Sequence, residues 1–327
     1  MVNAVETEKR VVKNDHLLKT NDVIRKVTPY IGLIVIIIFF GLLSEGLLFN
    51  SRNIKSMINQ LFPILIVSCG AVFVYSQGAM DVSVGAVVGV GALASAQILN
   101  STGSFALSFI ASIVIALIFA FANGWISGKL GMAPVMVSLC MMFVGRGIVT
   151  MGTTEPPTVY ANGDFSFLNN SIVKVVVMII FILVMTYIFN FTKIGKQVKG
   201  LGGNRVCSEQ VGINILKAQL LGYLTMAIGV GIASVFILSR IGSVTRNTGS
   251  GLEMDVLLAL IFGGIPLTGG SKSKISSAVV GSLIYVILGN GLLLSGIPVE
   301  VVPLVKGIIF LVVVFLSVSK SKKVLPR

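Results

Sequence analysis

Few residues of this chain could carry out acid–base, nucleophilic or metal chemistry. The single histidine, His16, lies in a charged N-terminal stretch, outside every apolar segment. One histidine there can form neither a metal cluster nor a Ser-His-Asp triad among those segments. The chain also lacks a Gly-x-x-x-x-Gly-Lys-Ser/Thr phosphate loop, so it should not hydrolyse ATP itself. We expect no catalytic residues, no metal site and no cofactor bound by this chain.

Ionisable side chains in or beside apolar segments are the next candidates, because charge at membrane depth is costly and usually functional. Asp81, with Ser83, precedes one apolar segment, and Glu253 and Asp255 precede another. These residues are expected to cap or gate the segments, since an acidic residue at a helix N-terminus stabilises the helix by about 0.5–2 kcal/mol. Arg146 lies inside a further segment, where it binds a backbone carbonyl, pairs with an acid or lines a pathway; the sequence does not choose among these.

Neutral amides are also embedded in the apolar segments. Asn123 and Asn290 suit an uncharged, hydroxylated solute better than an ion. The same side chains can equally hold neighbouring helices together by hydrogen bonds, which is the commoner role of any single one. Asn123, Arg146 and Asn290 are therefore the candidate residues of a solute pathway.

The segments that position these residues are too apolar for a soluble domain. Of the 327 residues, 55% are hydrophobic and 11% are charged, whereas soluble domains carry about a quarter charged residues. The sequence predicts an all-α polytopic membrane protein with about ten transmembrane helices. The eighth apolar window is short, and Met80-Asp81 alone joins the second and third, which indicates a broken or re-entrant helix. The windows lie near residues 29–49, 58–78, 82–99, 104–127, 131–151, 172–191, 218–238, 254–268, 277–295 and 300–318.

The net charge of +13 is distributed between the apolar windows, unlike the basic face of a nucleic-acid-binding protein. If the N-terminus is cytoplasmic, eighteen of the 25 Lys and Arg fall inside, which satisfies the positive-inside rule. We therefore expect an inner-membrane protein with both termini cytoplasmic. Its parts would be an N-terminal tail over residues 1–28, a transmembrane domain over 29–319 and a basic tail over 320–327. The basic inside loop over 192–217 is the expected contact with any cytosolic partner.

A short internal sequence repeat bears on the orientation of the two halves of the chain. Met80-Asp81-Val82 precedes the third window and Met254-Asp255-Val256 precedes the eighth. The two windows are an odd number of spans apart, so the two halves would have opposite orientations, as in inverted-repeat transporters. Coincidence is the alternative explanation of a match over three residues.

Three segments resemble one protein family. Residues 78–85 are similar to the Gly-Gly-Ile-Asp-Leu-Ser-Val-Gly signature of the permeases of ribose/xylose-type bacterial ABC importers, and residues 202–214 to their Gly-Gly-Asn-x-x-Ala-Ala-x-x-x-Gly-Ile-Asn cytoplasmic loop. Residues 249–255 and 262–270 resemble a third, glycine-rich run. The resemblance extends over roughly residues 30–320. The departures are Ala79, Leu252, Cys207-Ser208 and Ile265-Pro266, so the motifs do not specify the sugar.

The resemblance implies a mechanism and partners. Two copies of the permease, or this chain with a sister permease, would enclose a central pathway in the lipid membrane. An extracytoplasmic binding protein would deliver a ribose-like monosaccharide, and cytosolic ABC ATPase subunits, which hold ATP and Mg, would drive its import. A nucleoside or autoinducer-sugar importer is one alternative. An ion-coupled secondary carrier is another, and dependence on a separate ATPase distinguishes it.

The resemblance also assigns a coupling helix within the 192–217 loop. A Gly-Gly start, a short polar turn and a Gly-Ile-Asn end suit a compact helix parallel to the membrane, seated in a groove of the ATPase; a plain basic loop is the alternative. By the same resemblance, Glu253 and Asp255 either cap their helix or help to dock the binding protein. The residues assigned to coupling are Gly203, Asn204, Arg205, Cys207, Ser208, Glu209 and Gly212.

Overall fold

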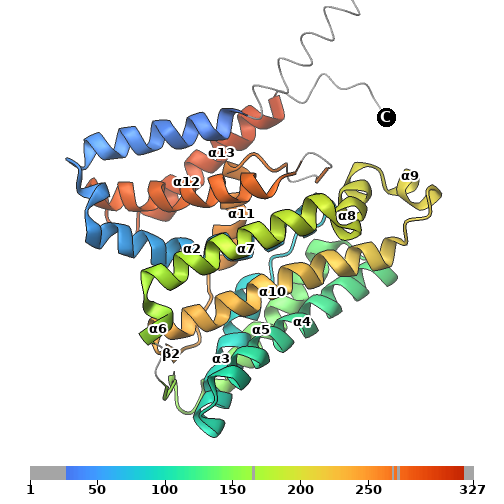
Figure 1. Ribbon diagram of the computed structural model, residues 1–327, viewed down its shortest axis with the longest axis horizontal. Coiled ribbons are helices and arrows are strands. Elements are labelled where there is room, and N and C mark those ends of the chain that lie inside the picture. Colours follow the sequence, from blue (N-terminus) through green and yellow to red (C-terminus); the bar gives the residue numbers. More distant parts are fainter. Residues whose placement is uncertain (1–26, 164–165, 267–268, 271–272, 320–327) are drawn as a thin grey trace, which may run out of the picture.

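The computed structural model describes residues 27–163, 166–266, 269–270 and 273–319, and within them the chain is a bundle of helices that run roughly side by side (Figure 1). Among these residues, seven helices are long and apolar enough to cross a membrane. They are α2 (Ser51–Ser76), α3 (Val84–Thr102), α4 (Phe105–Lys129), α5 (Pro134–Gly152), α7 (Ser171–Phe191), α10 (Ile215–Ile241) and α12 (Ile275–Leu294). The prediction of a polytopic helical membrane protein is confirmed.

Three further apolar helices are shorter. Val27–Leu43 precedes α2, α11 spans Leu252–Phe262, and α13 spans Val302–Ser319. The prediction of a short eighth segment was correct, because α11 has 11 residues. Residues 77–83, between α2 and α3, are not helical, as expected from the Met80-Asp81 junction. Apart from residues 27 and 28, the two predicted tails lie outside the described residues.

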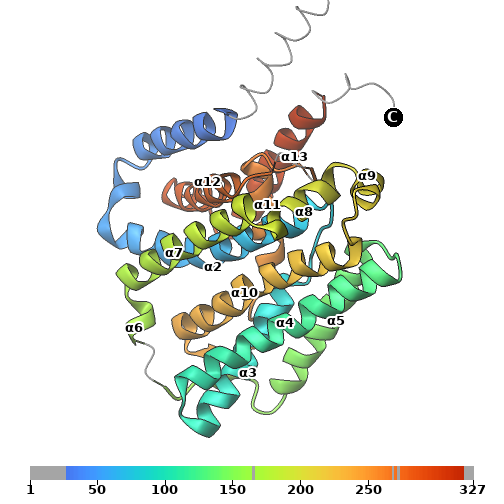
Figure 2. The same cartoon turned by 45° about the vertical axis from the view of Figure 1, so that its right-hand side comes forward.

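Small elements occupy the two ends of the bundle. At one end lie the helices α8 (Lys193–Gly203) and α9 (Arg205–Gln210), and Figure 2 shows α9 at the edge of the molecule. At the other end lie the 3-10 helix η1 (Leu47–Phe49) and the short helix α6 (Ser166–Asn169), with the strands β1 (Val159–Tyr160) and β2 (Ser243–Val244). The two strands pair antiparallel, with Val159 opposite Val244.

Local sequence explains where several helices begin and end. The side chains of Asn50, Asn170 and Asn214 accept hydrogen bonds from the first turns of α2, α7 and α10, which satisfies backbone donors that a helix start leaves free. Gly103 and Gly242 end α3 and α10 in the left-handed conformation, which glycine adopts without strain. These caps place the connections at the two ends of the bundle.

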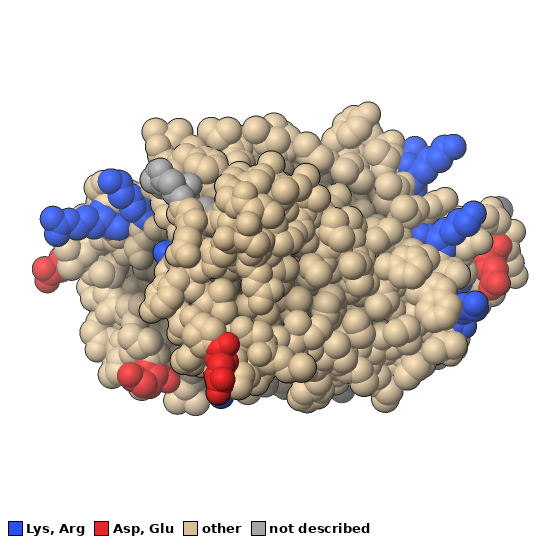
Figure 3. Space-filling model, turned by 90° about the horizontal axis from the view of Figure 1, so that it is seen from below, with Lys and Arg blue, Asp and Glu red and all other residues tan. Residues whose placement is uncertain are grey.

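The helices differ in how deeply they are buried. In α2, α3 and α12, 72% of the apolar window is buried, against 22% in α5. On the face seen in Figure 3, charged side chains gather toward the two ends and leave a broad central belt without them. An uncharged belt between charged ends is the surface that a membrane-embedded bundle requires.

The connection from β2 to α11 packs one side against α3, because Val244 and Thr248 are buried whereas Arg246, Asn247, Ser250 and Gly251 are exposed. It runs antiparallel to α3, because Asn100 near the end of α3 bonds β1, whereas Gly89 and Gly85 nearer its start lie against Thr248 and Gly249. Fifteen helical residues separate Asn100 from Gly85, so Gly249 lies up to ~22 Å farther along α3 than the strands, at 1.5 Å per residue. The connection therefore runs along α3 from the end that holds β1 and β2, and α11 continues toward the end that holds α8. α3 and α11 run in opposite directions, as an inverted repeat requires.

Candidate functional site at the start of α3

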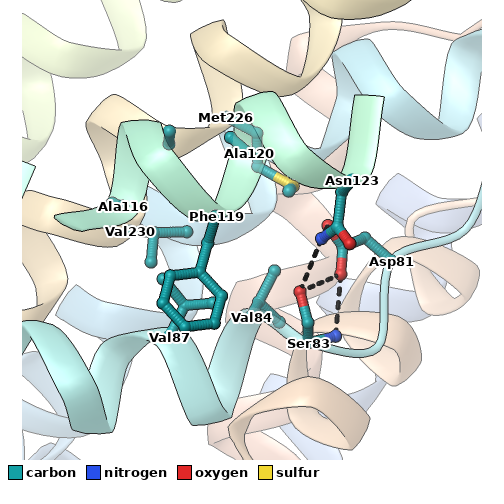
Figure 4. A pocket seen from close by; sticks show the side chains of 11 residues that line it. Asp81, Ser83, Val84, Val87, Ala116, Phe119, Ala120, Asn123, Met226 and Val230 are labelled. Atoms are coloured by element: carbon teal, nitrogen blue, oxygen red, sulfur yellow. Dashed lines mark hydrogen bonds between the residues drawn. The ribbon is translucent and has the colours of Figure 1, made fainter. Parts of the chain in front are cut away.

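Asp81 is held in a dense polar cluster immediately before α3. Its side chain is 3% exposed. Its Oδ1 accepts from the backbone N–H of Ser83 over 2.7 Å and from the Ser83 hydroxyl over 2.6 Å, and its Oδ2 accepts from the Asn123 amide on α4 over 3.1 Å. Figure 4 shows these side chains pointing toward one another. Three donors and the positive end of α3 stabilise the carboxylate, so the cluster secures the turn at which the helix begins.

A small cavity adjoins this cluster, between α3, α4 and α10. Asp81, Ser83 and Asn123 form its polar end. Its other walls are apolar, and it has room for about one water molecule. The Asn123 Oδ1, which is buried, has no hydrogen-bond partner among the residues that the structure describes. The cavity is too small for a monosaccharide. Its apolar lining is Val84, Val87, Ala116, Phe119, Ala120, Met226, Ala227 and Val230.

The connection before α3 is also attached to α5. The backbone N–H of Val82 donates to the Ser138 hydroxyl over 3.3 Å, and Ser138 is fully buried. Residues 81–83 therefore bond two different helices, α4 through Asn123 and α5 through Ser138. Such anchoring explains how a non-helical stretch persists inside an apolar bundle, where each unpaired backbone group is costly.

Arg146, on α5, clamps the β2–α11 connection just before α11. Its Nη1 donates to the Thr248 carbonyl over 3.0 Å, and its Nη2 donates to the Gly249 carbonyl over 3.1 Å. Its Nη2 also lies 3.6 Å from the Glu253 Oε2. Two of the alternatives for Arg146, carbonyl binding and pairing with an acid, thus occur together. The planar guanidinium donates in two directions at once, which a lysine could not reproduce.

Two glycines on α3 leave room for the backbone segment that Arg146 binds. A Cβ on Gly85 would overlap the Gly249 carbonyl and the Glu253 carboxylate, and one on Gly89 would lie 2.8 Å from the Thr248 carbonyl oxygen. Only a helix without side chains at these positions allows such close backbone approach. The two non-helical segments, one ending at Ser83 and one passing through Gly249, therefore meet at the first turn of α3.

The remaining polar candidates lie elsewhere. The Tyr285 hydroxyl on α12 donates to the Asp255 carboxylate, and the Lys306 Nζ on α13 lies 3.6 Å from the centre of the Tyr285 ring. The Asn290 amide donates to the Gln60 side chain on α2 over 3.1 Å. The structure thus brings Asn123 to Asp81 and Arg146 to Glu253, but it does not bring Asn290 to either group.

The predicted coupling residues lie in and beside α9. Asn204 accepts from the Cys207 N–H over 3.1 Å and so caps α9, and the buried Ser208 donates to the Asn204 carbonyl over 2.8 Å. Gly212 has a φ of +82°. Gly203, Arg205, Cys207 and Glu209 are exposed. Of the residues assigned to coupling, Asn204 and Ser208 therefore form hydrogen bonds that stabilise α9, whereas Arg205, Cys207 and Glu209 lie on its exposed surface.

Adjacent apolar residues extend that surface. Val206 and Val211 are 63% and 76% exposed. Both residues lie outside the long apolar helices, so their exposure is not that of a membrane-spanning helix face. On α8, by contrast, Lys199 donates to Asn190 over 2.9 Å and lies above the Phe189 ring, and partial burial lowers the pKa of Lys199. α8 is therefore tied to the bundle, whereas α9 presents exposed apolar residues.

Some partners were not predicted from the sequence. No sequence pattern indicated that Tyr285 would bond Asp255. None indicated that Arg146 would bond the carbonyls of Thr248 and Gly249. Gly202 belongs to the Gly-Gly motif, but only Gly203 was assigned to coupling. No local pattern identifies these residues, since their roles depend on segments far away in the chain.

Comparison with known proteins identifies related transport components. Residues 53–314 match the family described as the branched-chain amino acid transport system permease component. A fructose import permease protein of Bifidobacterium longum is 28% identical over 313 residues, covering 90% of this chain and 91% of that protein. A ribose import permease protein of Bacillus subtilis is 26% identical, covering 91% and 94%. A xylose transport system permease protein of Haemophilus influenzae is 26% identical, covering 90% and 96%. No solved structure matches the chain.

Proposed function

Because the chain belongs to the family of branched-chain amino acid transport system permease components, we propose that it is the membrane-spanning subunit of an ATP-driven importer that moves a monosaccharide into the cytoplasm. It is a multi-pass inner-membrane protein and a transport component rather than an enzyme. The observation that carries the proposal is similarity along about nine-tenths of both chains to fructose, ribose and xylose permeases.

The buried groups also favour an uncharged solute over an amino acid. An amino acid in a membrane pathway needs partners for both an ammonium and a carboxylate. Here the guanidinium of Arg146 is already occupied by two carbonyls and Glu253. Asp81 is occupied by Ser83 and Asn123. Neutral hydroxyl and amide groups remain, and these suit a sugar, with a nucleoside or an autoinducer sugar as the alternatives.

The proposed topology has ten membrane segments and both termini in the cytoplasm. Val27–Leu43, α11 and α13 would join the seven longer helices. Pro29 lies beside Gly264, which follows α11 near the end of the bundle that holds α8. The loop from 192 to 217 at that end carries Lys193, Lys196, Lys199, Arg205 and Lys217, so the positive-inside rule makes it the cytoplasmic end.

The partners are assigned by position and chemistry. Cytosolic ATPase subunits, with their ATP and Mg, would bind the exposed side of α9. There Val206 and Val211 supply apolar contacts between the charges of Arg205 and Glu209. An extracytoplasmic sugar-binding protein would dock at the opposite end, near β1 and β2. A second copy of this chain, or a sister permease, would complete the pathway.

The proposal is tested by purifying the tagged chain with its partners from native membranes and measuring ATP hydrolysis. We expect a co-purifying ATPase whose activity rises when the binding protein and its sugar are added. If instead the chain is recovered alone and moves solute under an ion gradient in ATP-free vesicles, it is a secondary carrier and the proposal fails.

The assignment of α9 is tested by two substitutions. Gly212→Pro is incompatible with a φ of +82°, because proline requires a φ near −65°. Glu209→Arg reverses a charge on an exposed side chain of α9. Both variants should insert into the membrane at normal levels and fail to transport. Normal uptake by both would exclude α9 as the coupling helix.

A further inference from the structure

The end of α8 meets two other segments backbone to backbone. A Cβ on Gly202 would overlap the carbonyl oxygen of Ser76, the last residue of α2, and would lie 3.1 Å from the Gly270 nitrogen. The Gly270 N–H donates to the same Ser76 carbonyl over 3.2 Å. α8, α2 and the segment before α12 therefore share one contact, which any side chain at position 202 would disrupt.

The neighbouring glycine, Gly269, packs in the same way on the connection that follows α2. A Cβ there would overlap the backbone of Gly78 and lie 2.9 Å from the Tyr75 carbonyl oxygen. Gly269 and Gly78 have φ angles of +75° and +77°, which other residues rarely adopt. Residues 269–270 thus hold the beginning of the 77–83 connection against α8.

The other end of the 77–83 connection is the polar cluster at the start of α3. There Asp81 bonds Asn123, and one turn later Gly85 lies against Gly249 and Glu253, which Arg146 clamps. A continuous series of close contacts therefore runs from α8 to the Arg146 clamp. The connection has seven residues, and at ~3.3 Å per residue these span up to ~23 Å.

We propose that Gly202 is the positioning residue through which a movement of α8 and α9 reaches the 77–83 connection and, through it, the starts of α3 and α11. The inference rests on the proposed function, since the movement is the one that an ATPase bound at α9 would impose. A backbone-to-backbone contact cannot absorb displacement by rotation of a side chain, because packed interfaces shift as units rather than deform smoothly. The test therefore measures the coupling between ATP hydrolysis and transport directly.

The experiment uses the complete complex of permease, ATPase and binding protein in proteoliposomes, with fructose, ribose and xylose as probes. It compares Gly202→Ala with Gly307→Ala, a helical glycine around which a Cβ would meet nothing within 4 Å. We expect Gly202→Ala to assemble and to hydrolyse ATP. It should lose roughly tenfold or more of its sugar uptake, together with the stimulation of ATP hydrolysis by the loaded binding protein. Gly307→Ala should behave as the wild type.

Two results would overturn the inference. Gly202→Ala could transport and respond to the binding protein as the wild type does, in which case the contact transmits nothing. It could also fail to assemble with the ATPase, in which case the contact has only a structural role. If the wild-type complex takes up none of the sugars with ATP, the proposed function fails instead, so the two failures are distinguishable.

Discussion

The starts of α3 and α11 carry the same Met-Asp-Val triplet but are held by different chemistry. At α3, uncharged donors from Ser83 and Asn123 surround Asp81. At α11, the charged Arg146 holds the preceding backbone and faces Glu253. The first start is bonded to both α4, through Asn123, and α5, through Ser138, whereas the backbone before the second is bonded to α5 through Arg146. A movement of α5 would therefore break both carbonyl bonds before α11 but only one of the bonds that hold the start of α3.

The largest effect is expected from removing the clamp. Arg146→Ala leaves two carbonyls without their donor and the Glu253 carboxylate without its ion-pair partner. Each hydrogen bond to a charged group contributes about 1.5–3 kcal/mol. We expect a loss of transport of roughly tenfold or more and a lower thermal unfolding temperature of the purified chain. Arg146→Lys should recover little, because an ammonium cannot bond both carbonyls in the geometry of the guanidinium.

The control for this prediction is the substitution of an exposed basic residue at the end of the bundle that holds β1 and β2. Lys55 is exposed on the first turns of α2, and Lys55→Ala should change the unfolding temperature little. An Arg146→Ala chain with wild-type stability and uptake would show that the start of α11 does not depend on α5.

The second prediction concerns the start of α3. Asp81→Ala removes the acceptor for three donors and should reduce transport severalfold and destabilise the chain by about 1–3 kcal/mol. Asp81→Asn keeps an acceptor for Ser83 and, once the Asn123 amide turns over, can donate to the Asn123 Oδ1 in place of accepting from its Nδ2. If Asp81 caps α3, Asp81→Asn should transport nearly as the wild type does. Uptake measurements that show both variants inactive would instead assign the negative charge a gating role.

The sequence predicts well whatever depends on neighbouring residues. Each apolar window corresponds to a helix, and the short α11 and the break before α3 were predicted, because hydropathy and an embedded Asp81 are local signals. The partners of Arg146 were not predicted, since it bonds carbonyls 102 and 103 residues away. Gly202 and Gly203 also look equivalent in the sequence. Only the position of Ser76 distinguishes them, because a Cβ would meet nothing at Gly203 and would overlap Ser76 at Gly202.

The third prediction divides the clamp into its parts. Glu253→Gln removes the ion pair and leaves both carbonyl bonds of Arg146, so it should cost less than Arg146→Ala. The Glu253 side chain is 12% exposed and lies 3.6 Å from Arg146. A double-mutant cycle of Glu253→Gln with Arg146→Ala, read by thermal unfolding, should give a coupling of about 0.5–3 kcal/mol. Strictly additive effects would mean that the backbone carbonyls alone hold the start of α11.

The smallest effect is expected away from both helix starts. Asn290 on α12 donates to Gln60 on α2 and to the Val286 carbonyl of its own helix, and it contacts neither Asp81 nor Arg146. Hydrogen bonds between membrane helices average about 0.6 kcal/mol in double-mutant cycles. Asn290→Leu should therefore lower the thermal stability slightly and leave sugar uptake and its sugar preference unchanged. Altered preference among fructose, ribose and xylose would instead place Asn290 on the solute pathway. The comparison of the two helix starts would then have to include α12, because a residue outside both starts would contact the solute.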